Sequence, residues 1–261
     1  MELKLKKLQK MLQRYAESDF CVAFSGGVDS ALLLILACEA AEKTGKTVYA
    51  LTMDTILHPK ADLKIARETA AMTNARHIIL TLDELAVPEI RNNPVNRCYL
   101  CKKELYSRMF QFAKEKGISV LLDGSNADDL HVYRPGLQAI RELGAKTPLA
   151  ECGLTKREIR RIAGLCHLPV AERPSTPCLA TRLPYGTKID LKILRKIGEA
   201  EELLRSAGYR NVRVRVHGDL VRLEVDTEDF DRILAEYERI VQSLKTMGFA
   251  YITLDMEGFR S

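Results

Sequence analysis

Six residues that follow a short apolar run have the types and spacing of an anion-binding loop. The apolar run is Phe20 to Phe24, the loop is Ser25-Gly26-Gly27-Val28-Asp29-Ser30, and a helical pattern continues to Lys43. Backbone N–H groups and hydroxyls at the positive end of a helix bind phosphate well. A glycine turn with Asp29 or Ser30 as the helix N-cap is the alternative. The order of strand, glycine loop and helix favours the phosphate site.

Acidic and amide side chains follow two further predicted strands. Asp54 ends the apolar run Val48 to Met53, and a polar run comes directly after Val120 to Leu122. That second run contains Gly124, Asn126, Asp128 and Asp129. Open parallel sheets bind ligands at the carboxyl ends of their strands, and Mg²⁺ takes carboxylate and phosphate oxygens. We therefore expect Asp128 or Asp129 to bind Mg²⁺, whereas Asp54 alone is better explained as a loop cap.

The seven cysteines fall into two groups. Four of them lie in or near predicted core elements and are expected to pack as small hydrophobic residues, namely Cys21, Cys38, Cys152 and Cys166. The other three are expected in polar, exposed loops. Cys98 and Cys101 form a CxxC motif just upstream of a predicted helix, and Cys178 lies in the proline-rich stretch PVAERPSTPCLATRLPYG.

Three chemistries could use the thiols of this second group. They suit a [4Fe–4S] cluster whose fourth iron stays open for a ligand such as hydrosulfide, but also a zinc site or a redox dithiol. A closed zinc site needs a fourth ligand, and none of His58, His131 and His167 stands at zinc-finger spacing. At this point all three alternatives stay open.

Arginines near the proline-rich loop are candidates for anion binding. Arg182 follows Cys178 closely, and Arg213 and Arg215 alternate with valines. Alternation with period two puts both guanidinium groups on one face of a strand, where they could clamp a phosphate or a carboxylate. A solvated strand face is the alternative explanation.

The elements that must position these residues form a βαβαβ pattern followed by a smaller unit. Strands separated by helices predict a doubly wound parallel sheet in an α/β domain, followed by an α+β domain. The further helices are expected at Lys4 to Ala16, Lys60 to Asn74, Lys102 to Lys116, Thr155 to His167, Leu191 to Ala207 and Phe230 to Lys245. The further strands are expected at His77 to Leu82, Val212 to Val216, Leu220 to Val225 and Ala250 to Leu254.

Composition excludes several classes of protein. A chain of 261 residues with 46% hydrophobic and 29% charged residues is typical of folded domains rather than disordered ones. Its formal charge of +5 is a weak signal for nucleic acid. The longest apolar run, Ala31 to Cys38, is too short to span a bilayer, and the odd number of cysteines argues against a disulfide-built secreted protein. A cytoplasmic location is expected.

Five motifs together carry a family resemblance. In order along the chain they are SGGVDS, GSNADD, LTKREIR, PCLATR and RVRVHGDLVRLEV. The first resembles the loop of the ATP pyrophosphatase (PP-loop) family, and the set resembles the LarE-type sulfur transferases, which mature the nickel-pincer cofactor of lactate racemase. The resemblance implies an ATP pyrophosphatase domain over residues 1–173 and a substrate-binding or oligomerisation domain over residues 174–261. It also implies ATP and Mg²⁺, which adenylate the carboxylates of pyridinium-3,5-biscarboxylic acid mononucleotide before sulfur makes them thiocarboxylates.

The resemblance also implies roles for individual residues. Cys178, Asp29 and Glu201 would be catalytic, and Arg213 and Arg215 would hold the substrate phosphate. Pyrophosphate would bind Ser25, Gly26, Gly27, Asp29 and Ser30, with Met53, Gly124, Asn126 and Arg182 as further nucleotide- or substrate-binding residues and Asp128 as a metal ligand. With Cys98 and Cys101 added to Cys178, the chain looks like the subgroup in which three cysteines hold a [4Fe–4S] cluster.

The partners implied are a small-molecule nucleotide substrate, a sulfur donor or lactate racemase maturation proteins, and further copies of the chain in a homo-oligomer. Neither a membrane nor a nucleic acid is implied. Two alternatives remain: a tRNA thiolase with the same loop and a cluster, for which no appended RNA-binding module is seen, and a zinc-stabilised nucleotide-binding module without catalysis.

Overall fold

The computed structural model describes residues 1–131 and 135–260, which form two compact units. The first unit comprises Met1–Ala86 and Asn96–Ser175, and the second comprises Val87–Val95 and Thr176–Ser261. The main crossing between the units thus lies after Ser175, close to the boundary at residue 173 that the sequence predicts. A short segment before the CxxC motif also belongs to the second unit, which the sequence does not predict.

The first unit is built on a parallel sheet, as the βαβαβ pattern predicts. In the described part of the chain this sheet has four strands in the order β3-β2-β1-β4. Their bounds are β1 Phe20–Ala23, β2 Val48–Thr55, β3 Arg76–Leu82 and β4 Leu121–Leu122. Because β1 lies between β2 and β4 and pairs parallel with both, the loops after all three strands emerge at the same end of the sheet. The phosphate loop and the polar run after β4 are therefore neighbours.

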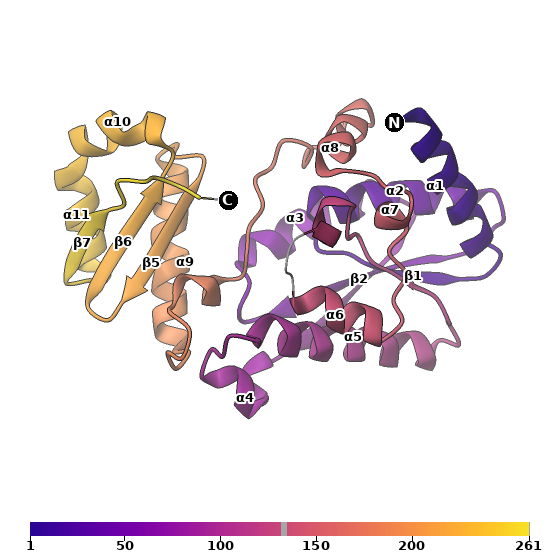
Figure 1. Ribbon diagram of the computed structural model, residues 1–261, viewed down its shortest axis with the longest axis horizontal. Coiled ribbons are helices and arrows are strands. Elements are labelled where there is room, and N and C mark those ends of the chain that lie inside the picture. Colours follow the sequence, from indigo (N-terminus) through magenta and orange to yellow (C-terminus); the bar gives the residue numbers. More distant parts are fainter. Residues whose placement is uncertain (132–134, 261) are drawn as a thin grey trace. The chain divides into compact units, whose positions relative to one another are not determined.

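Helices cover both faces of this sheet (Figure 1), as a doubly wound fold requires. The helices of the first unit are α1 Glu2–Tyr15, α2 Val28–Glu42, α3 Lys60–Ala70, α5 Arg97–Glu115, α6 Pro135–Glu142, α7 Pro148–Glu151 and α8 Lys156–Leu165. Because side chains alternate along each strand, successive residues pack on opposite faces of the sheet. Val22 and Ala50 pack with α1, α2 and α8, whereas Cys21, Tyr49 and Leu51 pack with α5 and α6.

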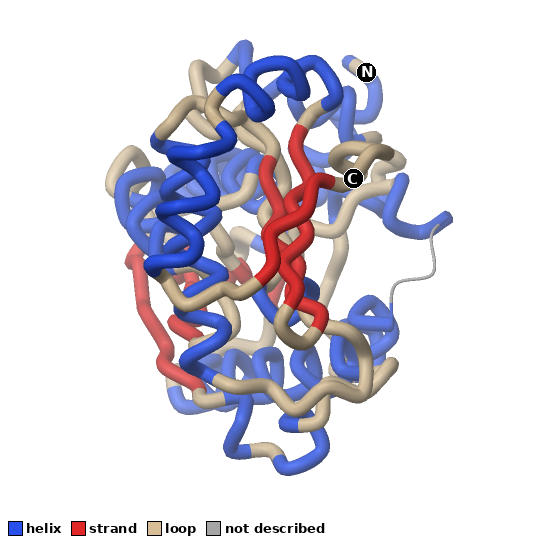
Figure 2. Tube along the Cα trace, turned by 90° about the vertical axis from the view of Figure 1, so that its left-hand side faces the viewer, coloured by secondary structure: helices blue, strands red, loops and turns tan. Residues whose placement is uncertain are grey.

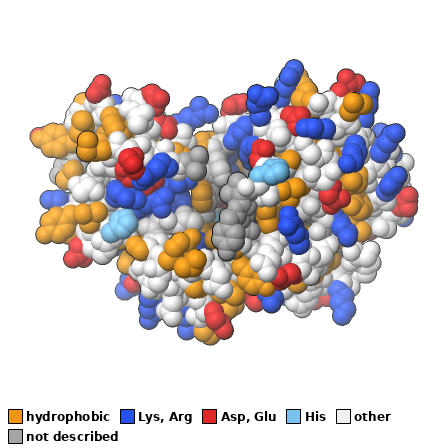
Figure 3. Space-filling model, viewed as in Figure 1, with side chains coloured by type: hydrophobic (Ala, Val, Ile, Leu, Met, Phe, Trp, Pro, Cys, Tyr) orange, Lys and Arg blue, Asp and Glu red, His pale blue; other side chains and the backbone are white. Residues whose placement is uncertain are grey.

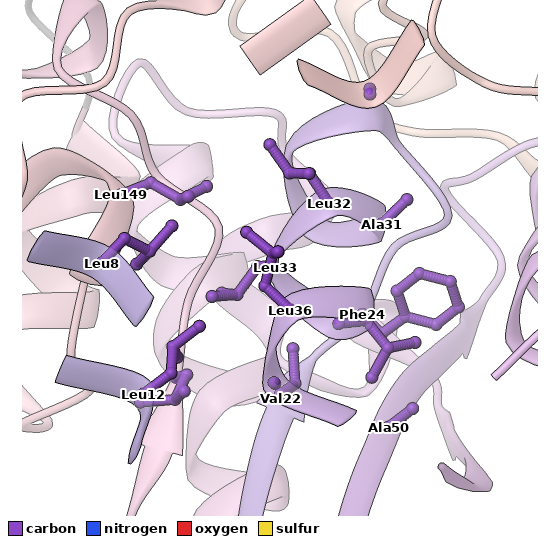
Figure 4. Close-up of a cluster of buried hydrophobic side chains, with 14 of the residues drawn as sticks. Leu8, Leu12, Val22, Phe24, Ala31, Leu32, Leu33, Leu36, Ala50 and Leu149 are labelled. Atoms are coloured by element: carbon purple, nitrogen blue, oxygen red, sulfur yellow. The ribbon is translucent and has the colours of Figure 1, made fainter. Parts of the chain in front are cut away.

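Helix α2 is apolar on every side because it lies between the sheet and an outer layer of helices. Leu32, Leu33 and Leu36 pack in one cluster with Leu8 and Leu12 of α1 (Figure 4). A helix buried all round has little freedom to shift. The phosphate loop at its N-terminus is therefore fixed in place by the core behind it.

The second unit packs helices against a small mixed sheet (Figure 2). Its elements are α4 Pro88–Arg91, α9 Leu191–Ser206, β5 Val212–His217, β6 Leu220–Val225, α10 Phe230–Ala235, α11 Tyr237–Thr246 and β7 Tyr251–Leu254. Strands β5 and β6 form the predicted antiparallel hairpin, and β7 pairs parallel to β6. The prediction of one helix from Phe230 to Lys245 is wrong, because the helix is interrupted at Glu236.

Candidate active site

The loop between β1 and α2, residues 25–30, is called the phosphate loop below. Gly26 has a φ of +75°, and a Cβ atom there would lie 3.0 Å from the backbone N and Cα of Ala66 in α3. Ser30 Oγ donates to the carbonyl of Gly27 at 3.0 Å and lies 3.2 Å from Ser25 Oγ. Only glycine fits such a close approach at positive φ. The loop thus leads into the first turn of α2, whose N–H groups have no partner within the helix and favour a phosphate.

Asp29 joins the phosphate loop to two other segments. The N-cap of α2 is Gly27, so the alternative that made Asp29 or Ser30 the cap is wrong. The Asp29 carboxylate instead forms an ion pair with Lys156 Nζ at the start of α8 and accepts a 3.3 Å hydrogen bond from Asn126 Nδ2. These contacts bring together the first three of the predicted motifs.

The polar run after β4 packs directly against the phosphate loop. A Cβ atom on Gly124 would lie 3.0 Å from the backbone N of Ser30 and 3.1 Å from its Cα. Asp123, one position earlier, accepts hydrogen bonds from the backbone N of Ser125 at 2.8 Å and from the hydroxyl of Tyr106 in α5. Burial, followed by the Asp123 charge, raises the pKa of Tyr106 well above its ordinary value, so Tyr106 stays a donor. Helix α5 therefore helps to hold this run in place.

The two adjacent aspartates of this run differ in setting. The Asp128 side chain is exposed, and its carboxylate accepts a 2.8 Å hydrogen bond from the backbone N of Lys156. Asp129 is buried, and its carboxylate accepts from the backbone N of Asn126 at 3.0 Å. Asp128 thus lies with Asp29 around Lys156, whereas Asp129 shapes the turn. This geometry favours Asp128 over Asp129 as a ligand of Mg²⁺.

Met53 and Asp54 lie near the carboxyl end of β2. Both are half-buried and pair in register with Leu80 and Thr81 of β3. Met53 packs at the edge of the core between the sheet and α5. The structure therefore places Met53 in a strand next to the one that leads into the phosphate loop, where its predicted contact with nucleotide stays a prediction.

In the second unit, Arg182 and Glu201 form a buried ion pair. Their side chains are 2% and 0% exposed, and Arg182 Nε donates to Glu201 Oε1 at 2.7 Å. The other Glu201 oxygen accepts from Arg182 Nη2 at 3.0 Å and from Arg205 Nη2 at 2.7 Å, and the backbone N of Val214 donates to Oε1. Both oxygens are thus engaged by protein groups. Contact geometry gives Glu201 a positioning role, and its catalytic role stays a prediction.

Arg182 also shapes the turn that carries Cys178. Its Nη1 atom donates to the carbonyls of Pro177 at 2.9 Å and Cys178 at 3.3 Å and to the hydroxyl of Thr181 at 2.9 Å. Cys178 is half-buried and precedes a short 3₁₀ helix, Leu179–Arg182. The loop is therefore rigidly held at the cysteine, by an arginine whose own position depends on Glu201.

One face of the β5–β6 hairpin carries a group of charged side chains (Figure 3), which we call the arginine face. Arg213 and Arg215 lie on it, as the alternating pattern predicts, opposite Glu224 and Arg222 of β6. Burial, followed by the charges of Arg182 and Arg215, lowers the pKa of Arg213. A concentration of positive charge of this kind is favourable for an anion.

Two residues of the arginine face, Glu224 and Arg222, are not among the site residues that the sequence predicts. Glu224 is 0% exposed, and Oε1 pairs with Arg215 and Arg222, whereas Oε2 has no hydrogen-bond partner among residues 1–131 and 135–260. Arg222 also lies 3.3 Å from the Asp255 carboxylate. The alternation RVRVHGDLVRLEV contains the signal for both, because antiparallel pairing puts every second residue of each strand on one face.

The prediction that the CxxC cysteines lie in exposed loops is wrong. Cys98 and Cys101 lie in the first turns of α5, where Cys101 is buried and Cys98 is half-buried. Arg97 Nη2 donates to Cys98 Sγ at 3.6 Å. These two cysteines belong to the first unit and Cys178 to the second. Within the described ranges, no three Cys, His, Asp or Glu side chains are grouped so as to hold a metal.

The other four cysteines pack in the core, as predicted. Cys21 and Cys152 are buried members of the two hydrophobic clusters, and Cys38 and Cys166 pack against one of them. Burial raises the pKa of Cys21 to about 12 and that of Cys38 to about 11. Thiols of this kind are poor nucleophiles at neutral pH.

Comparison with known proteins decides the family. The PP-loop domain matches residues 1–134, which include the phosphate loop and the polar run after β4. This chain belongs to the PP-loop family. It is 34% identical over 242 residues, 92% of its length, to the pyridinium-3,5-bisthiocarboxylic acid mononucleotide synthase of Lactiplantibacillus plantarum, of which it covers 86%. It is also 38% identical over 98% of its length to an uncharacterized protein of Synechocystis sp., of which it covers 95%.

The solved structure of NMN synthetase from Francisella tularensis has the same PP-loop fold. It matches 90% of this chain and 93% of its own with a TM-score of 0.50, at 18% sequence identity. The likeness confirms the α/β fold class. Together with the synthase, family membership confirms the expected class of enzyme, an ATP-dependent, adenylating sulfurtransferase.

Lys156, which the sequence prediction missed, contacts the phosphate loop through its ion pair with Asp29. The motif LTKREIR indicates a capping box, and the structure confirms it: Thr155 Oγ1 accepts from the backbone N of Glu158 at 3.3 Å, and Glu158 Oε2 accepts from that of Thr155 at 3.0 Å. The cap fixes where α8 begins and thus places Lys156 against Asp29. A lysine there can neutralise phosphate charge, which is what phosphoryl and nucleotidyl transfer chiefly need.

The helices over residues 1–131 and 135–260 are all too short or too polar to cross a lipid bilayer.

Proposed function

We propose that this PP-loop enzyme adenylates the carboxylates of pyridinium-3,5-biscarboxylic acid mononucleotide with ATP and converts them to thiocarboxylates. The observation that carries the proposal is the likeness to the Lactiplantibacillus synthase, which extends over 92% of the chain and so includes both units. A reaction between ATP and a phosphorylated substrate needs two anion sites. The phosphate loop and the arginine face are suited to these roles.

Adenylation would take place at the phosphate loop. A substrate carboxylate oxygen attacks the α-phosphorus of ATP, the bond from that phosphorus to the bridging oxygen breaks, and pyrophosphate leaves. The N–H groups at the start of α2 and the ammonium group of Lys156 would stabilise the charge that develops on pyrophosphate. Gly124, which packs against Ser30, and Asn126, which bonds to Asp29, keep the loop in this shape.

Mg²⁺ fits this site through Asp29 and Asp128. Both carboxylates contact Lys156: that of Asp29 pairs with Lys156 Nζ, and that of Asp128 accepts from the backbone N of Lys156. Mg²⁺ is usually held by one or two carboxylates together with phosphate oxygens. When bound with ATP, the ion would neutralise the leaving pyrophosphate, and Lys156 would have to give up or share its contact with Asp29.

The substrate phosphate would bind the arginine face. Arg213 and Arg215 are half-buried, and Arg215 Nη1 also donates to the carbonyl of Thr181 at 2.9 Å. That contact links the arginine face to the turn that carries Cys178. A planar guanidinium group held in this way can recognise a phosphate through two parallel hydrogen bonds.

Sulfur would enter at Cys178, where a sulfur nucleophile attacks the acyl carbon and AMP leaves. Cys98 and Cys101 stand three positions apart in one helix, so their thiols share a helix face as two ligands of one centre would. We propose that these two and Cys178 hold a [4Fe–4S] cluster, which would supply the sulfide. This part of the proposal rests on the donor set, since the two groups of thiols belong to different units.

We further propose that the thiolated nucleotide serves the maturation of a lactate racemase in the cytoplasm, that an external sulfur donor restores the sulfide, and that the enzyme works as a homo-oligomer. Light scattering behind a sizing column tests the last point directly, because a monomer would scatter with the mass of one chain, 29.4 kDa.

Separate assays of the two steps test the proposed function. Asp29→Ala is expected to abolish pyrophosphate release. Cys178→Ala is expected to keep pyrophosphate release and lose sulfur incorporation, measured by mass spectrometry of the nucleotide, while Cys166→Ala keeps both. Normal thiolation by Cys178→Ala would contradict the role of Cys178.

Metal analysis of protein purified without oxygen tests the cluster. About four irons and four sulfides per chain are expected, whereas colourless protein with one zinc would contradict the cluster.

A further inference from the structure

A short segment of the chain leaves the first unit between β3 and α5 and packs within the second. This segment, Val87–Val95, contains α4 and the buried side chain of Ile90. The chain returns to the first unit at Asn96, two residues before Cys98. The segment therefore joins the helix with the CxxC motif to the unit that carries Cys178.

Asn93 attaches this segment to the chain that follows Cys178. The Asn93 side chain is 0% exposed, and Nδ2 donates to the carbonyl of Leu183 at 3.2 Å and to that of Pro184 at 2.8 Å. The backbone carbonyl of Asn93 accepts from the N–H of Gly186 at 2.9 Å. One residue thus makes three hydrogen bonds to a stretch of four residues.

The backbone of Asn93 has an unusual conformation. Its φ is +47°, in the left-handed region that side chains other than those of Gly, Asn and Asp seldom adopt. A buried amide in a strained conformation persists only when the groups around it fix it there. Here the amide donates to two carbonyls, of which that of Pro184 also accepts from the backbone N of Thr187 at 3.3 Å.

The turn that carries Cys178 is therefore held from two sides. Arg182 binds the carbonyls of Pro177 and Cys178 at its start, and Asn93 binds the carbonyls of Leu183 and Pro184 at its end. Arg182 draws its own support from Glu201 in α9, whereas Asn93 belongs to the segment that leads to Cys98. The two supports come from different parts of the unit and act on the same stretch of eight residues, Pro177 to Pro184.

We propose that Asn93 is a positioning residue for Cys178: its amide fixes the end of the cysteine turn to the segment that leads into the CxxC helix, so that the thiol is presented in one place. The proposal rests on the proposed function in taking Cys178 as the residue through which sulfur passes. The position of the turn itself does not depend on that function.

The test compares Asn93→Gly with Asn92→Gly. Glycine at position 93 keeps the positive φ and loses the amide, whereas Asn92 is an exposed residue of the same type next to it. Alkylation of each cysteine by iodoacetamide is followed by peptide mass spectrometry. Loss of two hydrogen bonds predicts that Cys178 in Asn93→Gly reacts about tenfold faster, with Cys152 unchanged, since about 1.4 kcal/mol corresponds to a factor of ten. Asn92→Gly should match the wild type.

The two partial reactions give a second readout. Asn93→Gly is expected to release pyrophosphate at the wild-type rate and to incorporate sulfur about tenfold more slowly. Unchanged Cys178 alkylation and sulfur incorporation would overturn the proposal, and so would equal losses of both partial reactions, which would indicate a general folding role. If the wild type incorporates no sulfur at all, the proposed function fails, and the alkylation rates still decide whether Asn93 positions Cys178.

Discussion

The two polar centres of this chain are built on different principles. In the first unit, backbone segments approach so closely that a Cβ atom on Gly26 or Gly124 would lie only 3.0 Å from neighbouring backbone, and the ion pair of Asp29 with Lys156 is partly exposed. In the second unit, charged groups are buried and use one another as partners, with Glu201 and Glu224 both 0% exposed. The first centre should therefore be sensitive to the size of a side chain and the second to its charge.

The largest effect is expected from Glu201→Gln. Arg182, which is 2% exposed, would keep its charge and lose its carboxylate partner. Breaking a buried pair in this way costs about 3–5 kcal/mol. Urea unfolding followed by circular dichroism should show that loss, whereas Glu202→Gln, which removes a carboxylate 60% exposed beside Arg205, should change the free energy of unfolding by less than about 1 kcal/mol. Equal losses for the two variants would show that the buried pair is not what stabilises this unit.

A smaller effect, confined to nucleotide binding, is expected from Gly124→Ala. The added Cβ would lie 3.0 Å from the backbone N of Ser30, so the phosphate loop or the run after β4 must shift. Overpacking of this kind costs about 1–3 kcal/mol, and calorimetry should show ATP binding weakened about tenfold or more. Gly164→Ala in α8 is the control, because no described atom other than its chain neighbours and the nearby backbone of its own helix lies within 4 Å of its Cβ position. Unchanged ATP affinity in Gly124→Ala would mean that the loop tolerates size after all.

Residues of the first centre were predictable from the sequence where they belong to a local pattern. Ser25 to Ser30 and the run after Leu122 are local patterns at strand ends, and the order of strands then brings them together, so these parts of the site were predicted. Lys156 was missed because its contact with Asp29 joins residues 127 positions apart, and a lysine at a helix start looks like any surface lysine.

In the second unit the sequence predicted which face of a strand a side chain lies on, but not how deeply a side chain is buried or which group it pairs with. Alternation placed Arg213 and Arg215 on one face, but burial of Glu201 and the pairing of Glu224 depend on how α9 packs against the hairpin. The cysteine motif shows the same limit: CxxC looks like a loop in sequence, and only the packing of α5 shows that Cys101 is buried inside a helix. Tertiary contacts, which local patterns do not contain, decide both.

The smallest effect is expected from acid, and it concerns the capping box of α8 in the first unit. The hydrogen bond from Lys4, followed by that from the backbone N of Thr155, lowers the pKa of Glu158 to about 2. A carboxylate whose pKa is depressed on folding stabilises the protein above its unfolded pKa and loses that contribution as pH falls toward the folded value. The stability difference between wild type and Glu158→Gln should therefore be full at pH 7 and shrink steadily from about pH 4.5 to about pH 2. Because this capping box fixes the start of α8, Glu158→Gln should also weaken ATP binding slightly at pH 7. A stability difference that stays constant down to pH 2 would show that the cap does not depend on the carboxylate charge.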